Sequence, residues 1–320
     1  MQQTQTITGV EPKTRNWLPV INALYYVVLA AALLGFGYYL YSNLSLITLY
    51  LPFLLQAAGL TVGISLVSMV FAVILGLIGA LARLSRFALL RAIGTVYVEV
   101  VRGTPVLVQL LFWYYGVGQL LSTHGFDPYT LAFNFMTIFQ NNSLVPLAFS
   151  GWFYGILGLS FNYGAYLTEV FRAGIESVNK GQAEAALSLG MSSRQTMRHV
   201  VLPQAIRITI PPFTNYFITL IQDSALLLVL GVTELEQTTD SFAVPLIDPN
   251  QKLFIYVLGA MVYLAICYPL SLLARFLEAR LGRAYQTSGD KPDALRADML
   301  TSDMLGKQAV SFTEDEGDNE

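Results

Sequence analysis

Six long apolar runs constrain this sequence more than any other feature. They cover about residues 17–41, 53–81, 96–121, 147–171, 205–230 and 252–273. Each is long enough for an α-helix to cross a bilayer, which takes about 20 apolar residues. The runs are continuous and do not alternate as the strands of a β-barrel do. Because 54% of the residues are hydrophobic and only 12% are charged, we predict an all-α polytopic membrane protein with six transmembrane helices.

The uneven distribution of Lys and Arg between the loops orients these helices. Basic residues lie between the second and third runs, between the fourth and fifth, and after the sixth, as Arg86, Arg198 and Arg280 illustrate. Segments 42–52, 122–146 and 232–251 contain no Lys or Arg. We therefore expect both termini and the 173–204 loop to be cytoplasmic.

The same pattern divides the chain into four regions. A cytoplasmic N-terminal segment (1–16) precedes a first transmembrane helix with its outer loop (17–52). The main transmembrane domain covers 53–283 and contains the 173–204 loop. Residues 284–320 are acidic and poor in aromatic residues, which predicts a disordered cytoplasmic tail. The single cysteine, Cys267, excludes a disulfide framework, and no pattern of metal ligands or catalytic residues stands out.

The 122–146 loop is unusually rich in aromatic residues, among them Phe126, Phe133 and Phe135. It could form an interfacial amphipathic segment on the outer face of the membrane. It could equally be an ordered loop without a dedicated role. The sequence leaves this open.

Two pairs of opposite charges lie near the inner ends of the predicted spans. Glu99 and Arg102 are three residues apart, as are Glu169 and Arg172, so each pair shares one helix face. We interpret the pairs as structural, with a transport role as a gate latch as the alternative. Pro105 follows Arg102 closely and should bend or loosen the helix there.

Asp223 is a lone acid within the fifth run. Gln222 and Ser224 flank it, and Asn215 lies about two helical turns before it. This group could contact a polar substrate. It could also be a cluster of hydrogen bonds between helices. We expect Pro211 and Pro212 to break the helix before it.

The polar loop after the fourth run predicts two short helices. Glu184 to Leu189 favours a helix, and Gly190 is a suitable residue to end it. Ser192 can cap a second helix that runs toward Pro203. An ordinary amphipathic surface structure would look the same on physical grounds alone.

The loop resembles the signature loop of permease subunits of bacterial ABC importers. The resemblance consists of Glu184-Ala185-Ala186, three residues, Gly190, nine residues, and Val200-Val201-Leu202-Pro203. Val200 stands where isoleucine is common. The segments 98–105, 164–172 and 223–226 resemble the polar amino-acid branch, the histidine/glutamine/glutamate permease family. The resemblance covers about residues 53–280.

This resemblance implies a type I ABC importer permease fold in a bacterial inner membrane. In the family the loop docks on an ATPase subunit, which points to Glu184, Ala185, Ala186, Gly190, Leu202 and Pro203 as the coupling residues. Other implied partners are an ATPase dimer, a second permease subunit, a periplasmic amino-acid-binding protein, a polar amino acid and membrane lipid, but no nucleic acid. ATP and Mg²⁺ would bind the ATPase subunit. No cofactor would bind this chain, which contains no G-x-x-x-x-G-K-[ST] phosphate loop and is not expected to be an enzyme.

The resemblance also bears on the substrate path. The candidates for contact with the substrate are Asn215, Tyr216, Gln222, Asp223 and Ser224. Many relatives have an acid and a lysine where this chain has Tyr216 and Gln222, so its path would carry fewer charges. An alternative function is an amino-acid transporter driven by an ion gradient, which intramembrane acids such as Asp223 would suit.

Overall fold

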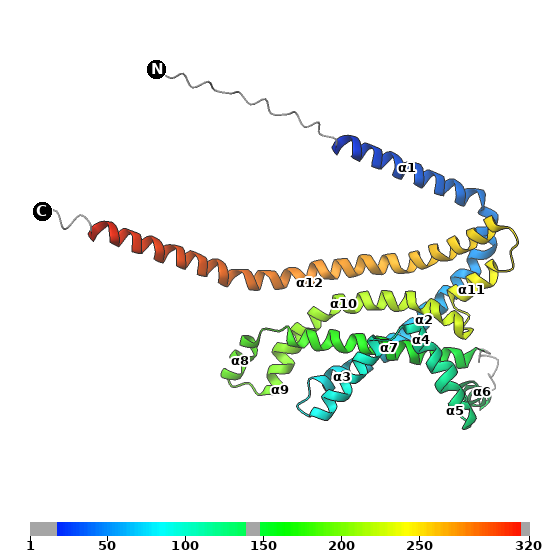
Figure 1. The fold of residues 1–320 in the computed structure, drawn as a ribbon, viewed down its shortest axis with the longest axis horizontal. Coiled ribbons are helices and arrows are strands. Elements are labelled where there is room, and N and C mark those ends of the chain that lie inside the picture. The colour runs from blue at the N-terminus through cyan, green and yellow to red at the C-terminus, as the bar shows by residue number, and fades with distance from the viewer. Residues whose placement is uncertain (1–17, 139–147, 315–320) are drawn as a thin grey trace, which may run out of the picture. The chain divides into compact units, whose positions relative to one another are not determined.

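The computed structural model describes the backbone of residues 18–138 and 148–314 and the side chains of residues 21–138 and 148–281. All regular elements in these residues are helical (Figure 1). They are α1 (Leu18–Ser42), α2 (Leu44–Arg83), α3 (Ala88–Arg102), α4 (Val106–Leu111), the π-helix η1 (Phe112–Gly118), α5 (Gln119–Thr123), α6 (Pro128–Ile138), α7 (Phe149–Glu176), α8 (Lys180–Ser188), α9 (Ser193–Thr196), the π-helix η3 (Met197–Val201), α10 (Leu202–Asp223), the 3₁₀-helix η4 (Ser224–Leu230), α11 (Leu235–Ala243) and α12 (Pro249–Glu314).

The chain divides into two compact units, Met1–Leu51 and Pro52–Glu320. In the first unit, α1 is apolar on all sides and its side chains from Ile21 to Tyr38 are exposed, which suits a helix surrounded by lipid. The predicted N-terminal segment 1–16 lies outside the described residues.

The expected outer loop over 42–52 is wrong, because α2 already begins at Leu44. Only Asn43 separates the two helices, and its side-chain amide donates to the carbonyl of Tyr39 at 2.9 Å. Pro52 lies inside α2. Its ring removes one backbone donor, but helices in an apolar segment can continue through such a residue.

A stripe of small residues along α2 allows α7 to approach closely. A Cβ atom on Gly76 would lie 2.7 Å from the Cβ of Leu167 of α7, so a larger residue there would force the helices apart. Around this contact, the core contains Leu110, Leu159, Tyr163, Leu220 and Leu227. α7 is therefore the helix around which α2, α4, α10 and η4 assemble.

Within the described residues, five helical segments are long and apolar enough to cross a membrane. They are Ile21–Ser42, Leu44–Arg83, Val106–Thr123, Ser193–Leu230 and Pro249–Leu281. α7 corresponds to the fourth predicted run, 147–171, and has 28 residues. Glycine, tyrosine, serine and asparagine lower its hydropathy, which a helix buried among other helices can accommodate.

The predicted weakening of the helix at Pro105 is confirmed. α3 ends at Arg102 and α4 begins at Val106. The amide of Gln109 donates to the carbonyl oxygens of Val101 (2.8 Å) and Thr104 (3.0 Å). This buried side chain thereby adds a donor to the carbonyl of Val101 near the end of α3 and to the carbonyl of Thr104 in the break.

Two expectations about α10 and α12 are wrong. α10 runs unbroken through Pro211 and Pro212, because neighbouring helices and polar side chains can satisfy the backbone groups that proline leaves free in an apolar segment. α12 is helical to Glu314, although a disordered tail was expected from residue 284. Every backbone hydrogen bond of an α-helix is internal to the segment, so a polar composition does not prevent a helix. Residues 315–320 lie outside the described part.

Candidate functional site

Two adjoining helices and a tight glycine turn form the loop over 173–204. The side chain of Asn179 caps the start of α8 by accepting from the backbone N–H of Gly181 at 2.8 Å. Ser192 and Gln195 form a reciprocal capping box at the start of α9. The two helices predicted from the sequence are therefore present, each with its own cap.

Gly190 ends α8 in the left-handed conformation, with φ of +86°. Its N–H donates to the carbonyl of Leu187 at 3.0 Å, and the N–H of Met191 donates to that of Ala186 at 3.2 Å. These two bonds are the Schellman pattern, which favours glycine at this position. No atom outside the local chain lies within 4 Å of a Cβ built on Gly190, so the constraint here is backbone conformation and not space.

A small apolar core fixes the loop to the membrane helices. Val178, Val201 and Ala205 are buried together where α7 ends and α10 begins. The amide of Gln204 also donates to the side-chain oxygen of Gln182 at 2.5 Å, which links α10 to α8. Because η3 continues directly into α10, a force applied to α8 or α9 reaches a membrane helix through a continuous backbone.

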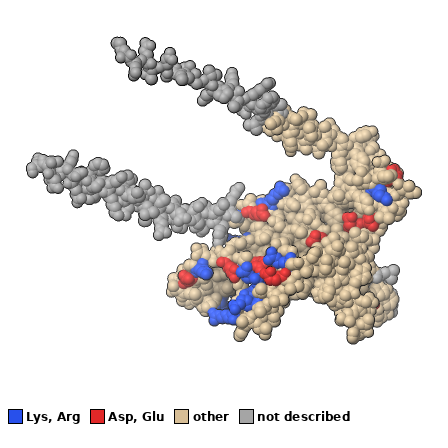
Figure 2. Space-filling model, in the orientation of Figure 1, with Lys and Arg blue, Asp and Glu red and all other residues tan. Residues whose placement is uncertain are grey.

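The predicted coupling residues divide into an inner and an outer set. Ala186 is buried, whereas the exposed residues are Glu184, Ala185, Gly190, Leu202 and Pro203. Leu189 beside the turn has 86% of its surface exposed. The loop therefore presents an apolar side chain and small residues outward. Figure 2 shows Lys and Arg gathered, with some Asp and Glu, over the end of the second unit that carries α3, α8 and α9.

Of the two predicted charge pairs, only one forms. Arg172 contacts Glu169 at 2.8 Å, and this pair extends to Arg83 of α2 and to Glu176. Among the side chains that the structure describes, no ion pair joins Glu99 to Arg102. That predicted pairing is wrong, because Arg102 is the last residue of α3 and its guanidinium lies over the ring of Tyr166, 5.4 Å from the centroid.

A cavity of about 480 Å³ lies where the break after α3 meets α7 and α10. Both charged and polar side chains line it. Its lining consists of Arg102, Gly103, Thr104, Pro105, Val106, Asn162, Tyr163, Tyr166, Tyr216, Thr219 and Asp223. The interruption of the third predicted span thus opens a polar space beside α7.

Tyrosine hydroxyls and rings organise this cavity. The hydroxyl of buried Tyr163 donates to Oδ2 of Asp223 at 2.7 Å and so orients the carboxylate. The rings of Tyr166 and Tyr216 lie with centroids 5.3 Å apart. A guanidinium and a carboxylate therefore share one cavity with aromatic faces, a combination that can bind a molecule carrying both charges.

The five substrate-path candidates do not all reach this cavity. Tyr216 and Asp223 line it. The amide of Asn215 instead donates to Glu278 of α12 at 3.1 Å, and Ser224 is buried and donates to the carbonyl of Ile221 at 2.7 Å. Gln222 is exposed and does not line the cavity.

Sequence reasoning missed five polar residues of this cavity: Thr104, Asn162, Tyr163, Tyr166 and Thr219. One signal was available, since Thr219 lies one helical turn before Asp223 and Asn162 one turn before Tyr166. Among the described residues, no group of three or more His, Cys, Asp and Glu side chains could hold a metal ion.

The chain is similar in sequence to a known family of membrane proteins. Residues 72–283 match the family of binding-protein-dependent transport system inner membrane components. The L-cystine transport system permease protein TcyB of Bacillus subtilis is 38% identical over 223 residues, which are 70% of this chain and 84% of the relative. The glutamine transport system permease protein GlnP of Escherichia coli is 32% identical over 232 residues, covering 72% of this chain and 94% of GlnP.

A solved structure shows the same fold. It is the crystal structure of an amino acid ABC transporter with histidines, which is 30% identical and aligns with a TM-score of 0.60 over 74% of this chain and 97% of that one. With the family match over residues 72–283, it leads to one conclusion: the chain is an integral membrane protein of the family of inner membrane components of binding-protein-dependent transport systems.

Proposed function

We propose that the chain is the permease subunit through which a polar amino acid enters the cell, driven by a separate ATPase subunit. The observation that carries this proposal is the cavity in which Arg102 and Asp223 lie among polar and aromatic side chains. The names of the relatives, which refer to cystine, glutamine and amino acids, support the same class of substrate.

The two charges of the cavity match the two charges that every free amino acid carries. A guanidinium can bind a carboxylate through two parallel hydrogen bonds, so Arg102 would hold the α-carboxylate. The Asp223 carboxylate, oriented by Tyr163, would accept from the α-ammonium group. Tyr216, Thr219 and Asn162 would face the rest of the substrate, while Asn215 and Ser224 would support the helices around it.

The loop over 173–204 would carry the coupling. Its exposed residues Glu184, Ala185, Gly190, Leu202 and Pro203 would contact one subunit of an ATPase dimer, and buried Ala186 would keep α8 in place. ATP and Mg²⁺ would be held by that ATPase, with no cofactor on this chain. The continuous path from η3 into α10 supports this role, since α10 also carries Tyr216 and Asp223 of the cavity.

The complete importer would contain further partners. A second permease subunit would complete the pathway, and a periplasmic binding protein would deliver the amino acid from the outer side of a bacterial inner membrane. The loop charges support an orientation with both termini in the cytoplasm.

Uptake by proteoliposomes tests the proposal. The chain would be reconstituted with its co-purifying subunits and binding protein, and uptake of a mixture of labelled amino acids measured with and without internal ATP. We expect uptake only with ATP and with the ATPase subunit present. Uptake that continues on an ion gradient without ATP would show a secondary transporter instead.

A further inference from the structure

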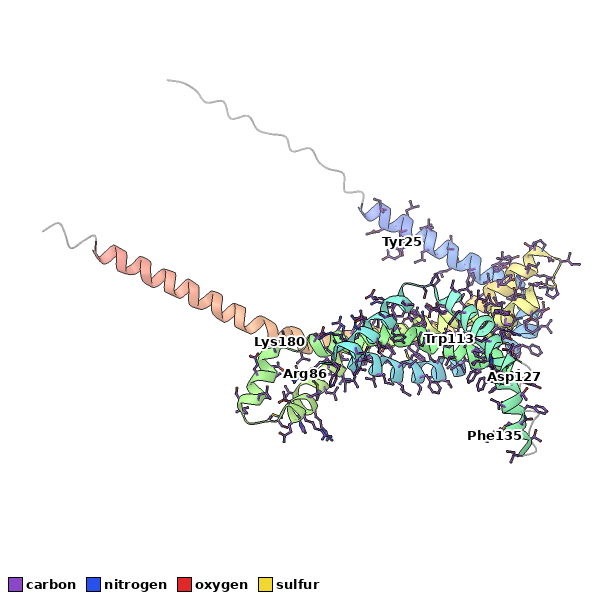
Figure 3. All side chains as sticks on the ribbon, turned by 60° about the horizontal axis from the view of Figure 1, so that its bottom comes forward. Tyr25, Arg86, Trp113, Asp127, Phe135 and Lys180 are labelled. Atoms are coloured by element: carbon purple, nitrogen blue, oxygen red, sulfur yellow. The ribbon has the colours of Figure 1, made fainter. Side chains whose placement is uncertain are left out.

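Helix α6 begins at the end of the membrane domain opposite the cytoplasmic loop. Oδ1 of Asp127, just before α6, accepts from the hydroxyl of Ser150 in the first turn of α7 at 2.9 Å. The backbone N–H of Tyr129 also donates to the Ser150 hydroxyl at 3.2 Å. The start of α6 therefore lies beside the first turn of α7. In Figure 3, Asp127 and Phe135 lie at the end of this unit opposite Lys180 and Arg86, with Trp113 between them.

The exposed half of α6 is divided lengthwise into an apolar and a polar stripe. Leu131, Phe135 and Ile138 follow i, i+4, i+7 spacing and are 50%, 60% and 74% exposed. Beside them, with the same spacing, lie Thr130, Asn134 and Thr137, which are also exposed. The other side, formed by Pro128, Tyr129, Ala132, Phe133 and Met136, is buried or half-buried.

Two further features restrict what can cover the apolar stripe. Residues 128–138 contain no charged side chain, so attraction to a charged surface cannot hold the helix. Aromatic side chains cluster around the start of α6. The ring centroids of Phe126 and Phe153 are 6.1 Å apart, and those of Tyr129 and Phe133 are 5.9 Å apart. Tyrosine, with an apolar ring and a polar hydroxyl, is enriched where the hydrocarbon of a bilayer meets its headgroups, and Tyr129 is the residue of this kind here.

We propose that α6 is a membrane-interface helix that binds the lipid on the side opposite the 173–204 loop. Leu131, Phe135 and Ile138 enter the edge of the hydrocarbon, and Thr130, Asn134 and Thr137 face headgroups and water. A boundary between two media explains why adjacent stripes of one helix differ so sharply in polarity while both are exposed. Asp127 and Ser150 hold the helix at that boundary.

Spin-label accessibility tests this placement in the assembled permease complex. Cys267 is the only cysteine, so Cys267→Ala provides a background for the single-cysteine pair Phe135→Cys and Asn134→Cys. Both would be labelled in nanodiscs of phosphatidylethanolamine and phosphatidylglycerol. Collision with oxygen, which concentrates in lipid, is compared with collision with a water-soluble nickel chelate.

We expect a several-fold higher ratio of oxygen to nickel collisions at position 135 than at position 134. Equal ratios with free access of nickel would overturn the proposal in favour of a helix in water. Low collision rates with both reagents at position 135 would overturn it in favour of a protein partner. The pair Ile138→Cys and Thr137→Cys repeats the comparison one turn later, so that the result does not depend on tolerance of one substitution.

Discussion

At the scale of single residues, Arg102 shows how position along a helix decides the role of a charge. Its spacing from Glu99 predicts a pair on one helix face. Because α3 ends at Arg102, the side chain is free to lie over Tyr166 and to line the cavity. Glu169 and Arg172 have the same spacing within the continuous helix α7, and they do form a pair.

The Asp223 carboxylate gives the first prediction. Asp223→Asn keeps the size of the side chain and its ability to accept from Tyr163, but removes the charge. A hydrogen bond to a charged group contributes about 1.5–3 kcal/mol, so we expect the rate of ATP-driven uptake to fall about 10-fold or more.

Gln222→Ala is the matched control, because Gln222 is the exposed neighbour that does not line the cavity. Both variants should co-purify with the ATPase subunit. Equal uptake by Asp223→Asn and the native protein would assign Asp223 to helix packing.

Gly190 gives a prediction about coupling. Its φ of +86° suits glycine and, less well, asparagine, whereas a β-branched residue is strained there by about 1–2 kcal/mol. We expect Gly190→Val to reduce co-purification of the ATPase about 10-fold and Gly190→Asn to preserve most of it. Because the space around Gly190 is open, a strong defect in Gly190→Asn as well would indicate direct contact with a partner instead of backbone strain.

At the scale of elements, prolines have opposite effects in α10 and after α3. Pro211 and Pro212 remain inside a continuous helix, whereas the segment containing Gly103 and Pro105 ends one. The difference lies in the surroundings: Gln109 provides an alternative donor for the carbonyls of Val101 and Thr104, so the break is satisfied. The sequence shows all three prolines but not these partners.

The anchor of α6 predicts a dependence on pH. The Thr130 hydroxyl, with further donors from Ser150 and the backbone, lowers the pKa of the Asp127 carboxyl below its ordinary value. Because the pKa is lowered in the folded state, the ionised carboxylate stabilises the folded anchor at pH values above the ordinary pKa of about 4. This stabilisation is lost as the pH falls through the lowered value.

Hydrogen exchange of the α6 amides tests this dependence. After correction for the intrinsic rate, protection should be lower at pH 3 than at pH 7 in the native protein. In Asp127→Asn, protection should be lower at pH 7 and nearly independent of pH. The same loss at low pH in both proteins would mean that another group controls the anchor.

At the scale of the whole molecule, the position of the charges determines how the chain crosses the membrane. Most Lys and Arg residues that Figure 2 shows gather at the end with α3, α8 and α9, in agreement with the loops from which the orientation was predicted. We therefore expect Asp248→Cys, in the Cys267→Ala background, to react with an impermeant thiol reagent from outside. Lys180→Cys should react only after the inner membrane is permeabilised. The reverse pattern would invert the proposed orientation.

The sequence by itself determined the features that depend on local chemistry. The apolar runs, the bias of Lys and Arg, the two short helices of the loop and the glycine that ends the first of them all follow from neighbouring residues, and the loop pattern identified the family. The break at Pro105 was predicted as well, but the same missing backbone donor did not break α10 at Pro211 and Pro212.

Only the tertiary structure decided which residues face the cavity and which contact other helices. Arg102, Tyr163 and Asp223 come from three helices, and nothing in their local sequence states that they meet. Asn215 and Ser224 seemed equally suitable from their spacing, but they bind Glu278 and the backbone of α10. The rotation and approach of packed helices depend on small-residue contacts such as Gly76 against Leu167, which act between segments far apart in the chain.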